Sequence, residues 1–337
     1  MLRCLRKFLR VMTACAALAG TSLGAAAVPT CGGANVLDEL RSVAPDLHAR
    51  VLREADATSN ASHVLWRVER AGTPTSHLLG TIHLTDQRVT TLSPNVQSAL
   101  ASARVVALEV ADLTPEATAA AMGKSGQLVA FSDGRRLDSM LTSDELEIAG
   151  RTLSGAGIPA AAAPLFRPWV VTMMLALSEC ERERTRAGRA VLDARIAEEA
   201  RTGGKAIVGL ESIASQLEAM ASVPHEQQVG MLKASLRYAD RADDNMETLL
   251  QLYAGRKLGA VWPLQIALAE RAGIGRDAFA GFHKLLVVDR NLRMSEKARP
   301  LLEKGDALIA VGALHLIGEH GLVALLRKAG FTLTPVE

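Results

Sequence analysis

Two histidines each follow a glycine by three residues at the end of an apolar run. Gly80-Thr81-Ile82-His83 follows the apolar segment His77-Leu78-Leu79, and Gly312-Ala313-Leu314-His315 lies within the apolar run 307–316. Such runs, rich in aliphatic and β-branched residues, predict buried strands. A glycine in a strand lets backbone or ligand approach closely. The two G-x-x-H units are far apart in sequence, so we expect the fold to assemble a site from them.

Two glutamates end other apolar runs. Arg104–Val110 carries Glu109 near its end, and Lys205–Glu211 ends on Glu211. A carboxylate at such a position is costly unless it is paired or binds a ligand. Sites in open α/β sheets form at the carboxyl ends of the strands. We therefore expect Glu109 to join the two histidines, whereas Glu211 is explained equally well by a plain salt bridge.

Two imidazoles with one or two carboxylates suit a divalent metal that keeps open positions. Such an ion lowers the pKa of a bound water and polarises a carbonyl. Without a metal, the same groups could act as general acid and base on a water. Arg290, on a predicted helix before the last strands, could clamp a carboxylate, orient Glu109 or stabilise an oxyanion, and a solvated or capping arginine is the alternative.

Other catalytic motifs are absent from the sequence. It contains no G-x-S-x-G nucleophile elbow, no P-loop, no H-E-x-x-H and no Rossmann glycine fingerprint.

The alternation of strands and helices predicts an α/β fold with a mixed, partly parallel central sheet. The first half offers G-T-I-H and then A-L-E, and the second offers G-L-E and then G-A-L-H, so we expect two related halves. A mainly helical section at 212–299 is predicted as an insertion or cap. We also expect a hairpin from 62–70 and 76–84, a buried apolar helix over 164–180 and a single helix over 181–202.

Residues 1–27 have the pattern of a secretory signal peptide: a basic start, an apolar stretch and Ala25-Ala26-Ala27 for cleavage. The apolar stretch is short for a membrane anchor. We therefore expect one exported domain, periplasmic or secreted, over 28–337, with no membrane span after cleavage. Without the four basic residues among the first ten, the formal charge of +2 becomes −2, which leaves no case for nucleic-acid binding.

Removal of the leader leaves two cysteines, Cys31 and Cys180. In an oxidising compartment this pair favours a disulfide. Closing so long a loop could contribute roughly 4 kcal/mol of stability. The alternative is a buried Cys180 thiol on a helix and a Cys31 in a frayed terminus.

Taken in order, these motifs resemble those of the TraB/GumN family, which includes PrgY and the Tiki metalloproteases. The resemblance covers roughly residues 31–337. The motifs that carry it are Leu78–Asp86, Ala107–Glu109, Gly209–Glu211 with Gln216, Asp289–Asn291 with Met294, and Val311–Gly318 through Gly330-Phe331.

The resemblance implies an erythromycin-esterase/ChaN-like α/β fold and an exported bacterial protein. For the Tiki branch it implies a protease that uses Mn2+ or Co2+, with Zn2+ also possible. Carried over residue by residue, His83, Glu109 and His315 would bind the metal, and Glu109, Glu211 and Arg290 would act in catalysis on a peptide or protein substrate.

Two alternative functions stay open at this point. Some members of the family are linked to exopolysaccharide gene clusters or to peptide-pheromone shut-down, and relatives bind haem. The protein could therefore be a non-catalytic haem- or metal-binding protein. It could also be an accessory protein in exopolysaccharide or envelope biogenesis.

Overall fold

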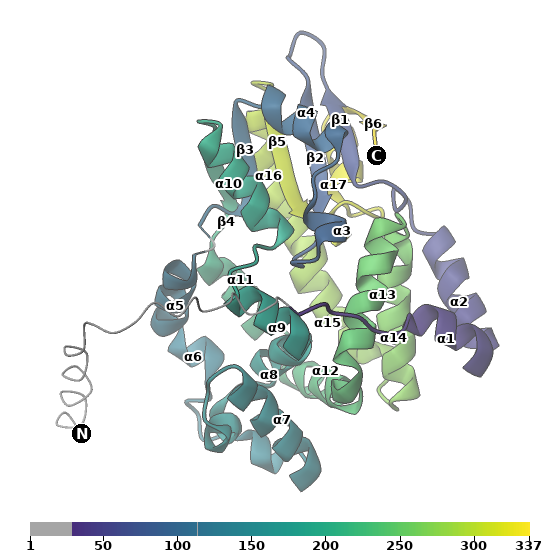
Figure 1. Ribbon diagram of the computed structural model, residues 1–337, viewed down its shortest axis with the longest axis vertical. Helices are drawn as coiled ribbons and strands as arrows, with labels where there is room; N and C mark the ends of the chain where they lie inside the picture. Colours follow the sequence, from purple (N-terminus) through teal and green to yellow (C-terminus); the bar gives the residue numbers. More distant parts are fainter. Residues whose placement is uncertain (1–28, 113) are drawn as a thin grey trace, which may run out of the picture.

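A six-stranded sheet forms the upper part of the molecule (Figure 1). The computed structural model describes residues 29–112 and 114–337, so the predicted signal peptide lies outside the described residues. The strand order is β4-β3-β5-β2-β1-β6, with parallel pairing among β4, β3, β5 and β2 and antiparallel pairing of β1 with β2 and β6. This confirms the predicted mixed, partly parallel sheet. The strands are β1 (Leu65–Glu69), β2 (Ser76–Thr81), β3 (Val105–Val110), β4 (Ala206–Glu211), β5 (Ala307–Gly312) and β6 (Thr332–Pro335).

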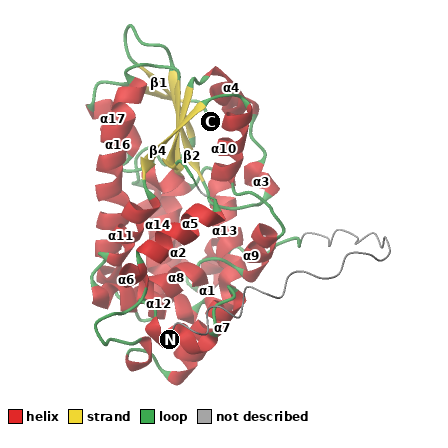
Figure 2. Ribbon diagram, turned by 90° about the vertical axis from the view of Figure 1, so that its left-hand side faces the viewer, coloured by secondary structure: helices red, strands yellow, loops and turns green. Residues whose placement is uncertain are grey.

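Helices cover both faces of this sheet. Figure 2 shows α16 (Asp289–Leu302) and α17 (Leu322–Lys328) on one face, and α4 (Pro94–Ser102) and α10 (Leu192–Thr202) on the other. Each face has its own apolar cluster, because alternate strand residues point to opposite sides. Leu78 and Ile309 pack with α16 and α17, whereas Leu79 and Leu308 pack with α4 and α10.

The remaining helices gather below the carboxyl ends of the parallel strands (Figures 1 and 2). They come from the N-terminal segment, from the section between β3 and β4, and from the section between β4 and β5. The helical part is therefore broader than the predicted section at 212–299. Its helices are α1 (Val36–Val43), α2 (Pro45–Asp56), α5 (Pro115–Lys124), α6 (Gly126–Val129), α7 (Ser143–Gly155), α8 (Pro168–Leu175), α9 (Glu179–Arg186), α11 (Ile213–Ala221), α12 (His225–Arg237), α13 (Ala242–Ala254), α14 (Val261–Arg271) and α15 (Ala280–His283).

The strand register brings the ends of four strands to one edge. Thr81 of β2 pairs with Gly312 of β5, and Val110 of β3 pairs with Glu211 of β4. Each pair stands at or next to the end of its strands. The loop after β2 leads into the short helix α3 (Gln87–Thr90). The residues that follow these strands therefore face the helical part.

The segment 307–316, which the sequence predicts as one strand, forms two elements. β5 ends at Gly312, and Ala313–His315 form a 3-10 turn in which Leu316 N–H donates to the Ala313 carbonyl. The strand ends there because Thr81, the partner of Gly312, is the last residue of β2. His315 consequently turns away from the strand direction.

The two helices predicted over 164–202 are also wrong in their boundaries. Pro164 lies in a 3-10 turn, α8 begins at Pro168, and α9 begins after Ser178, whose hydroxyl accepts a hydrogen bond from Glu181 N–H. Serine at this position stabilises a new helix start. Gly188, with φ of +80°, separates α9 from α10. Cys180 therefore belongs to the start of α9.

Cys31 and Cys180 form a disulfide, which confirms the pairing that the sequence favours. Across residues 29–112 and 114–337, no helix has the length and apolar character needed to cross a bilayer.

Gly80 allows β2 to approach the turn after β5. A Cβ at this position would lie 3.0 Å from Ala313 Cα and 3.0 Å from Leu316 Cδ2. We expect Gly80→Ala to lower the free energy of unfolding by about 1–3 kcal/mol, because the turn would have to move. Gly123→Ala is the control, since nothing lies within 4 Å of a Cβ at that position. Urea unfolding tests this, and equal stability of the two variants would contradict it.

Candidate active site

His83 lies in the loop after β2 and is oriented by a buried aspartate. Its Nδ1 lies 2.8 Å from Asp193 Oδ2, and the Thr81 hydroxyl donates to Asp193 Oδ1 at 2.7 Å. The carboxylate accepts, so Nδ1 carries the proton and Nε2 faces away from Asp193. The charge of Asp193 raises the pKa of His83 to about 9. The side chain is 61% exposed and open to an incoming molecule.

His315 is held in a different way. Its Nδ1 lies 2.7 Å from Asn291 Oδ1, and Asn291 Nδ2 donates to the His320 carbonyl at 2.8 Å. The second bond fixes which end of the amide faces the ring, so Nδ1 of His315 is the donor. Burial lowers the pKa of His315 to about 4. At neutral pH this ring is therefore uncharged, and its Nε2 has a free lone pair.

Glu109 lies between the two histidine-bearing segments. Its Oε1 accepts from Gly312 N–H at 2.7 Å, and its Oε2 accepts from Arg290 Nη2 at 2.6 Å and from Gln216 Nε2 at 3.1 Å. Burial raises the pKa of Glu109, but the neighbouring imidazoles, Arg290 and the Gly312 N–H outweigh it and lower the pKa to about 2. The carboxylate is therefore ionised.

Arg290 joins Glu109 to Glu211. Its Nε donates to Glu211 Oε2 at 2.8 Å, and its Nη2 lies 2.7 Å from the same oxygen. The Glu211 side chain is 2% exposed and pairs with Arg290. Arg290 also donates to the Leu286 carbonyl, in the π-helical turn Lys284–Val288 that precedes α16. Such turns are frequent at functional sites. Arg290 and Glu211 are placed to position Glu109.

Two hydrogen-bond acceptors face each other at the centre of this arrangement. His315 Nε2 lies 3.7 Å from Glu109 Oε1. The neutral ring offers a lone pair there, and the carboxylate offers another, so no hydrogen bond joins them. Glu109 and His315 are both buried residues. Such a pair is stabilised by a cation or a proton that both can bind.

Gly312 lies close to all three residues predicted as metal ligands. A Cβ on Gly312 would lie 3.2 Å from Glu109 Oε1, 3.6 Å from His315 Cδ2 and 3.8 Å from His83 Nε2. The three residues predicted as metal ligands therefore approach one another beside Gly312. Within the part of the chain that the structure describes, no group of three His, Cys, Asp or Glu side chains is already close enough to hold an ion. Imidazole and carboxylate groups are nevertheless of the types that bind divalent cations.

The structure brings all five predicted site residues together, and it adds two that sequence reasoning missed. Asp193 has a recognisable signal: it occupies the apolar face of α10 with Leu192, Ile196 and Ala200, where an acid is unexpected. Asn291 directly follows Arg290 and is fully buried. It lies in the Asp289–Asn291 motif, but nothing in its sequence context indicates a contact with His315.

Comparisons with known proteins identify a family and a relative of this chain. The model of the TraB/PrgY/gumN family matches residues 64–335, a range that includes every residue described above. The chain is also similar to a protein named Metalloprotease TIKI homolog from Nematostella vectensis. The two are 26% identical over 351 residues, which covers 89% of this chain and 73% of that protein. No solved structure matches the chain.

The charge of Asp193 is expected to control the titration of His83. In the metal-free protein, Asp193→Asn should return the pKa of His83 from about 9 toward 6.5, as measured by NMR titration. The pair contributes stability below about pH 6.5, which is lost as the pH rises through 9, and the variant should lose this dependence. Glu198→Gln, at an exposed position of the same helix, should leave the pKa of His83 unchanged.

Arg290 pairs with two buried carboxylates, and its loss should be strongly destabilising. We expect Arg290→Gln to lower the free energy of unfolding by about 3–5 kcal/mol, because the buried side chains of Glu109 and Glu211 would lose the cation that pairs with both. Arg293→Gln removes an arginine from the same helix that is 47% exposed and 3.7 Å from Glu211. It should change stability by less than about 1 kcal/mol. Thermal unfolding compares the two, and similar losses would contradict this role of Arg290.

Proposed function

Since the chain belongs to the TraB/PrgY/gumN family, we propose that it is an exported, metal-dependent hydrolase that cleaves peptide bonds. The facing lone pairs of His315 Nε2 and Glu109 Oε1, 3.7 Å apart, support this most strongly. Neither atom can donate to the other, so the arrangement favours a shared cation. His83, whose Nε2 is turned away from Asp193 and also lies near Gly312, would supply the third ligand.

His83, Glu109 and His315 would hold the ion. Two imidazoles and one carboxylate are compatible with Mn2+, Co2+ or Zn2+. A divalent ion bound there would lower the pKa of a water and polarise a carbonyl oxygen.

The other residues of the site would keep these donors in place. Asp193 and Asn291 hold the Nδ1 atoms of the two rings and turn both Nε2 atoms away from these partners. The Nε2 of His315 has a free lone pair, whereas an ion at His83 would have to displace the Nε2 proton of the charged ring. Arg290 and Gln216 bind Oε2 of Glu109, while Oε1 accepts from Gly312 N–H and lies 3.7 Å from His315 Nε2. Glu211 balances the charge of Arg290. Under this proposal Arg290 and Glu211 are positioning residues.

A peptide substrate and export rest on different observations. The relative from Nematostella vectensis is named as a metalloprotease, which favours a peptide bond as the target. The exposed His83 lets an extended chain approach from the solvent side. The Cys31–Cys180 disulfide favours an oxidising compartment, in agreement with the predicted signal peptide.

The metal site is tested by elemental mass spectrometry of the purified protein after loading with Mn2+, Co2+ or Zn2+. We expect about one tightly bound ion per chain, lost in the variant His83→Ala/His315→Ala. Hydrolysis of a peptide library in the same samples should fall by more than the roughly 10–100-fold that loss of a supporting residue causes.

His48→Ala/His225→Ala is the matched control for the metal experiment, because it removes two histidines that belong to α2 and α12. This variant should retain both the ion and the activity. Equal metal content in the two double variants would contradict the proposed ligands. A stoichiometric ion without hydrolysis of any peptide would retain the metal site and refute the peptidase activity.

A further inference from the structure

We propose that Glu181 is a positioning residue for the loop that carries His83, and that the Cys31–Cys180 disulfide keeps Glu181 in place. The importance of this position for function rests on the function proposed above. The loop comprises residues 82–86, between β2 and α3, and has no regular secondary structure. Its conformation therefore depends on contacts from other parts of the chain.

Glu181 binds the loop two residues after His83. Its Oε1 accepts from Thr85 N–H at 2.6 Å, and its Oε2 accepts from the Thr85 hydroxyl at 3.0 Å. Thr85 is 3% exposed and Glu181 is 5% exposed. Charge-assisted hydrogen bonds of this kind are strong, and water has little access to replace them. The carboxylate therefore fixes both the backbone and the side chain of Thr85.

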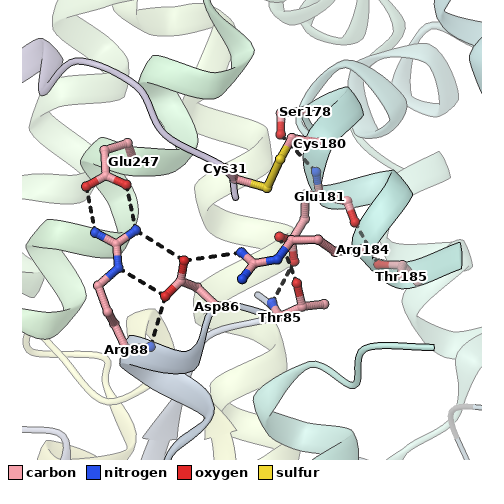
Figure 3. The surroundings of a disulfide bond; sticks show 10 residues. All are labelled: Cys31, Thr85, Asp86, Arg88, Ser178, Cys180, Glu181, Arg184, Thr185 and Glu247. Atoms are coloured by element: carbon pink, nitrogen blue, oxygen red, sulfur yellow. Dashed lines mark hydrogen bonds and ion pairs between the residues drawn. A yellow bond between two sulfur atoms is a disulfide. The ribbon is translucent and has the colours of Figure 1, made fainter. Parts of the chain in front are cut away.

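The helix that carries Glu181 is short and needs support of its own. α9 has eight residues, and the Ser178 hydroxyl accepts from Glu181 N–H at its first turn. Figure 3 shows Cys180, the residue before Glu181, joined to Cys31. On the next turn, Arg184 Nη1 lies 3.2 Å from Asp86 Oδ2. The disulfide is thus a covalent cross-link to α9 at the residue next to Glu181.

The disulfide connects α9 to α13 through the segment after Cys31. Ala34 N–H donates to Asp244 Oδ1 at 2.8 Å, and Val36 N–H donates to the Thr248 hydroxyl at 2.8 Å. Asp244 and Thr248 both belong to α13. The disulfide and these hydrogen bonds therefore link the position of Glu181 to α13.

Helix α13 also binds the end of β2, before the loop, and Arg88, after the loop. Tyr253 of α13 donates from its hydroxyl to the Gly80 carbonyl at 2.7 Å. Arg88, just after the loop, donates to both oxygens of Glu247 at 2.8 Å and to Asp86 at 3.0 Å (Figure 3). α13 therefore holds the residues on both sides of the loop, and Glu181 of α9 supplies the contact at Thr85 itself.

This anchoring matters because His83 has little support of its own. Its ring is held at Nδ1 by Asp193, and 61% of the side chain is exposed. The path of the loop backbone thus decides where Nε2 lies relative to Glu109. A loosened loop would retain the His83–Asp193 bond and lose the fixed spacing to the other donors.

Hydrogen–deuterium exchange of the full protein without metal tests the anchoring directly. Glu181→Gln retains the size of the side chain and leaves a single acceptor oxygen for the two Thr85 donors. Glu183→Gln makes the same chemical change at an exposed position of α9. We expect exchange in residues 82–90 to rise about tenfold in Glu181→Gln and to stay unchanged in Glu183→Gln.

Two further changes separate anchoring from general damage. Cys31→Ser/Cys180→Ser should raise exchange in the same peptide, because α9 loses its tie to α13. Thr85→Val removes one donor while Thr85→Ser retains it, so the serine variant should behave like the wild type. If Glu181→Gln does not fold, the comparison of the two Thr85 variants decides the question.

The link to His83 has its own readouts. In Glu181→Gln the NMR signal of the His83 ring should shift or broaden, and affinity for Mn2+ should fall about tenfold. Exchange and ring signal identical to the wild type would overturn the proposal. Faster exchange with an unchanged ring signal and unchanged Mn2+ affinity would also overturn it. If the wild type binds no metal, the proposed function fails, and exchange together with the ring signal still decides the role of Glu181.

Discussion

The buried, ionised carboxylate of Glu109 is the constraint on which the site depends. A carboxylate at the end of a central strand needs donors on every side, and Gly312 N–H, Arg290 and Gln216 provide them from β5, α16 and α11. Arg290 in turn needs a second acid, which β4 supplies as Glu211. One charge therefore ties two strands and two helices to the same edge of the sheet.

The two G-x-x-H units are alike in sequence and different in physical state. Asp193 holds a solvent-exposed His83 and favours its charged form, whereas Asn291 holds a buried and neutral His315. The glycines differ as well. Gly80 allows close packing of β2 against the turn after β5, while Gly312 allows close approach of the Glu109 carboxylate. Similar motifs thus perform different tasks, because one strand end is covered by the polypeptide and the other faces solvent.

The helical part does more than cover the site. α13 contacts the end of β2 through Tyr253, the start of α3 through Glu247, and the N-terminal segment through Asp244 and Thr248. Because that segment carries Cys31, a covalent bond extends the same framework to α9 and to Glu181. The loop around His83 is held by this framework and not by the sheet alone.

The sequence by itself determined the central strands, because short aliphatic runs that are rich in β-branched residues and bounded by turn signals favour buried strands. It also singled out His83, Glu109 and His315, since polar residues directly after such runs must lie at a strand end. Only the tertiary structure decided what holds each of them. Asp193 and Asn291 come from helices about 110 and 24 residues away from their histidines, and such pairings have no local signature. The end of β5 at Gly312 was likewise set by the length of its partner strand, which local propensity does not record.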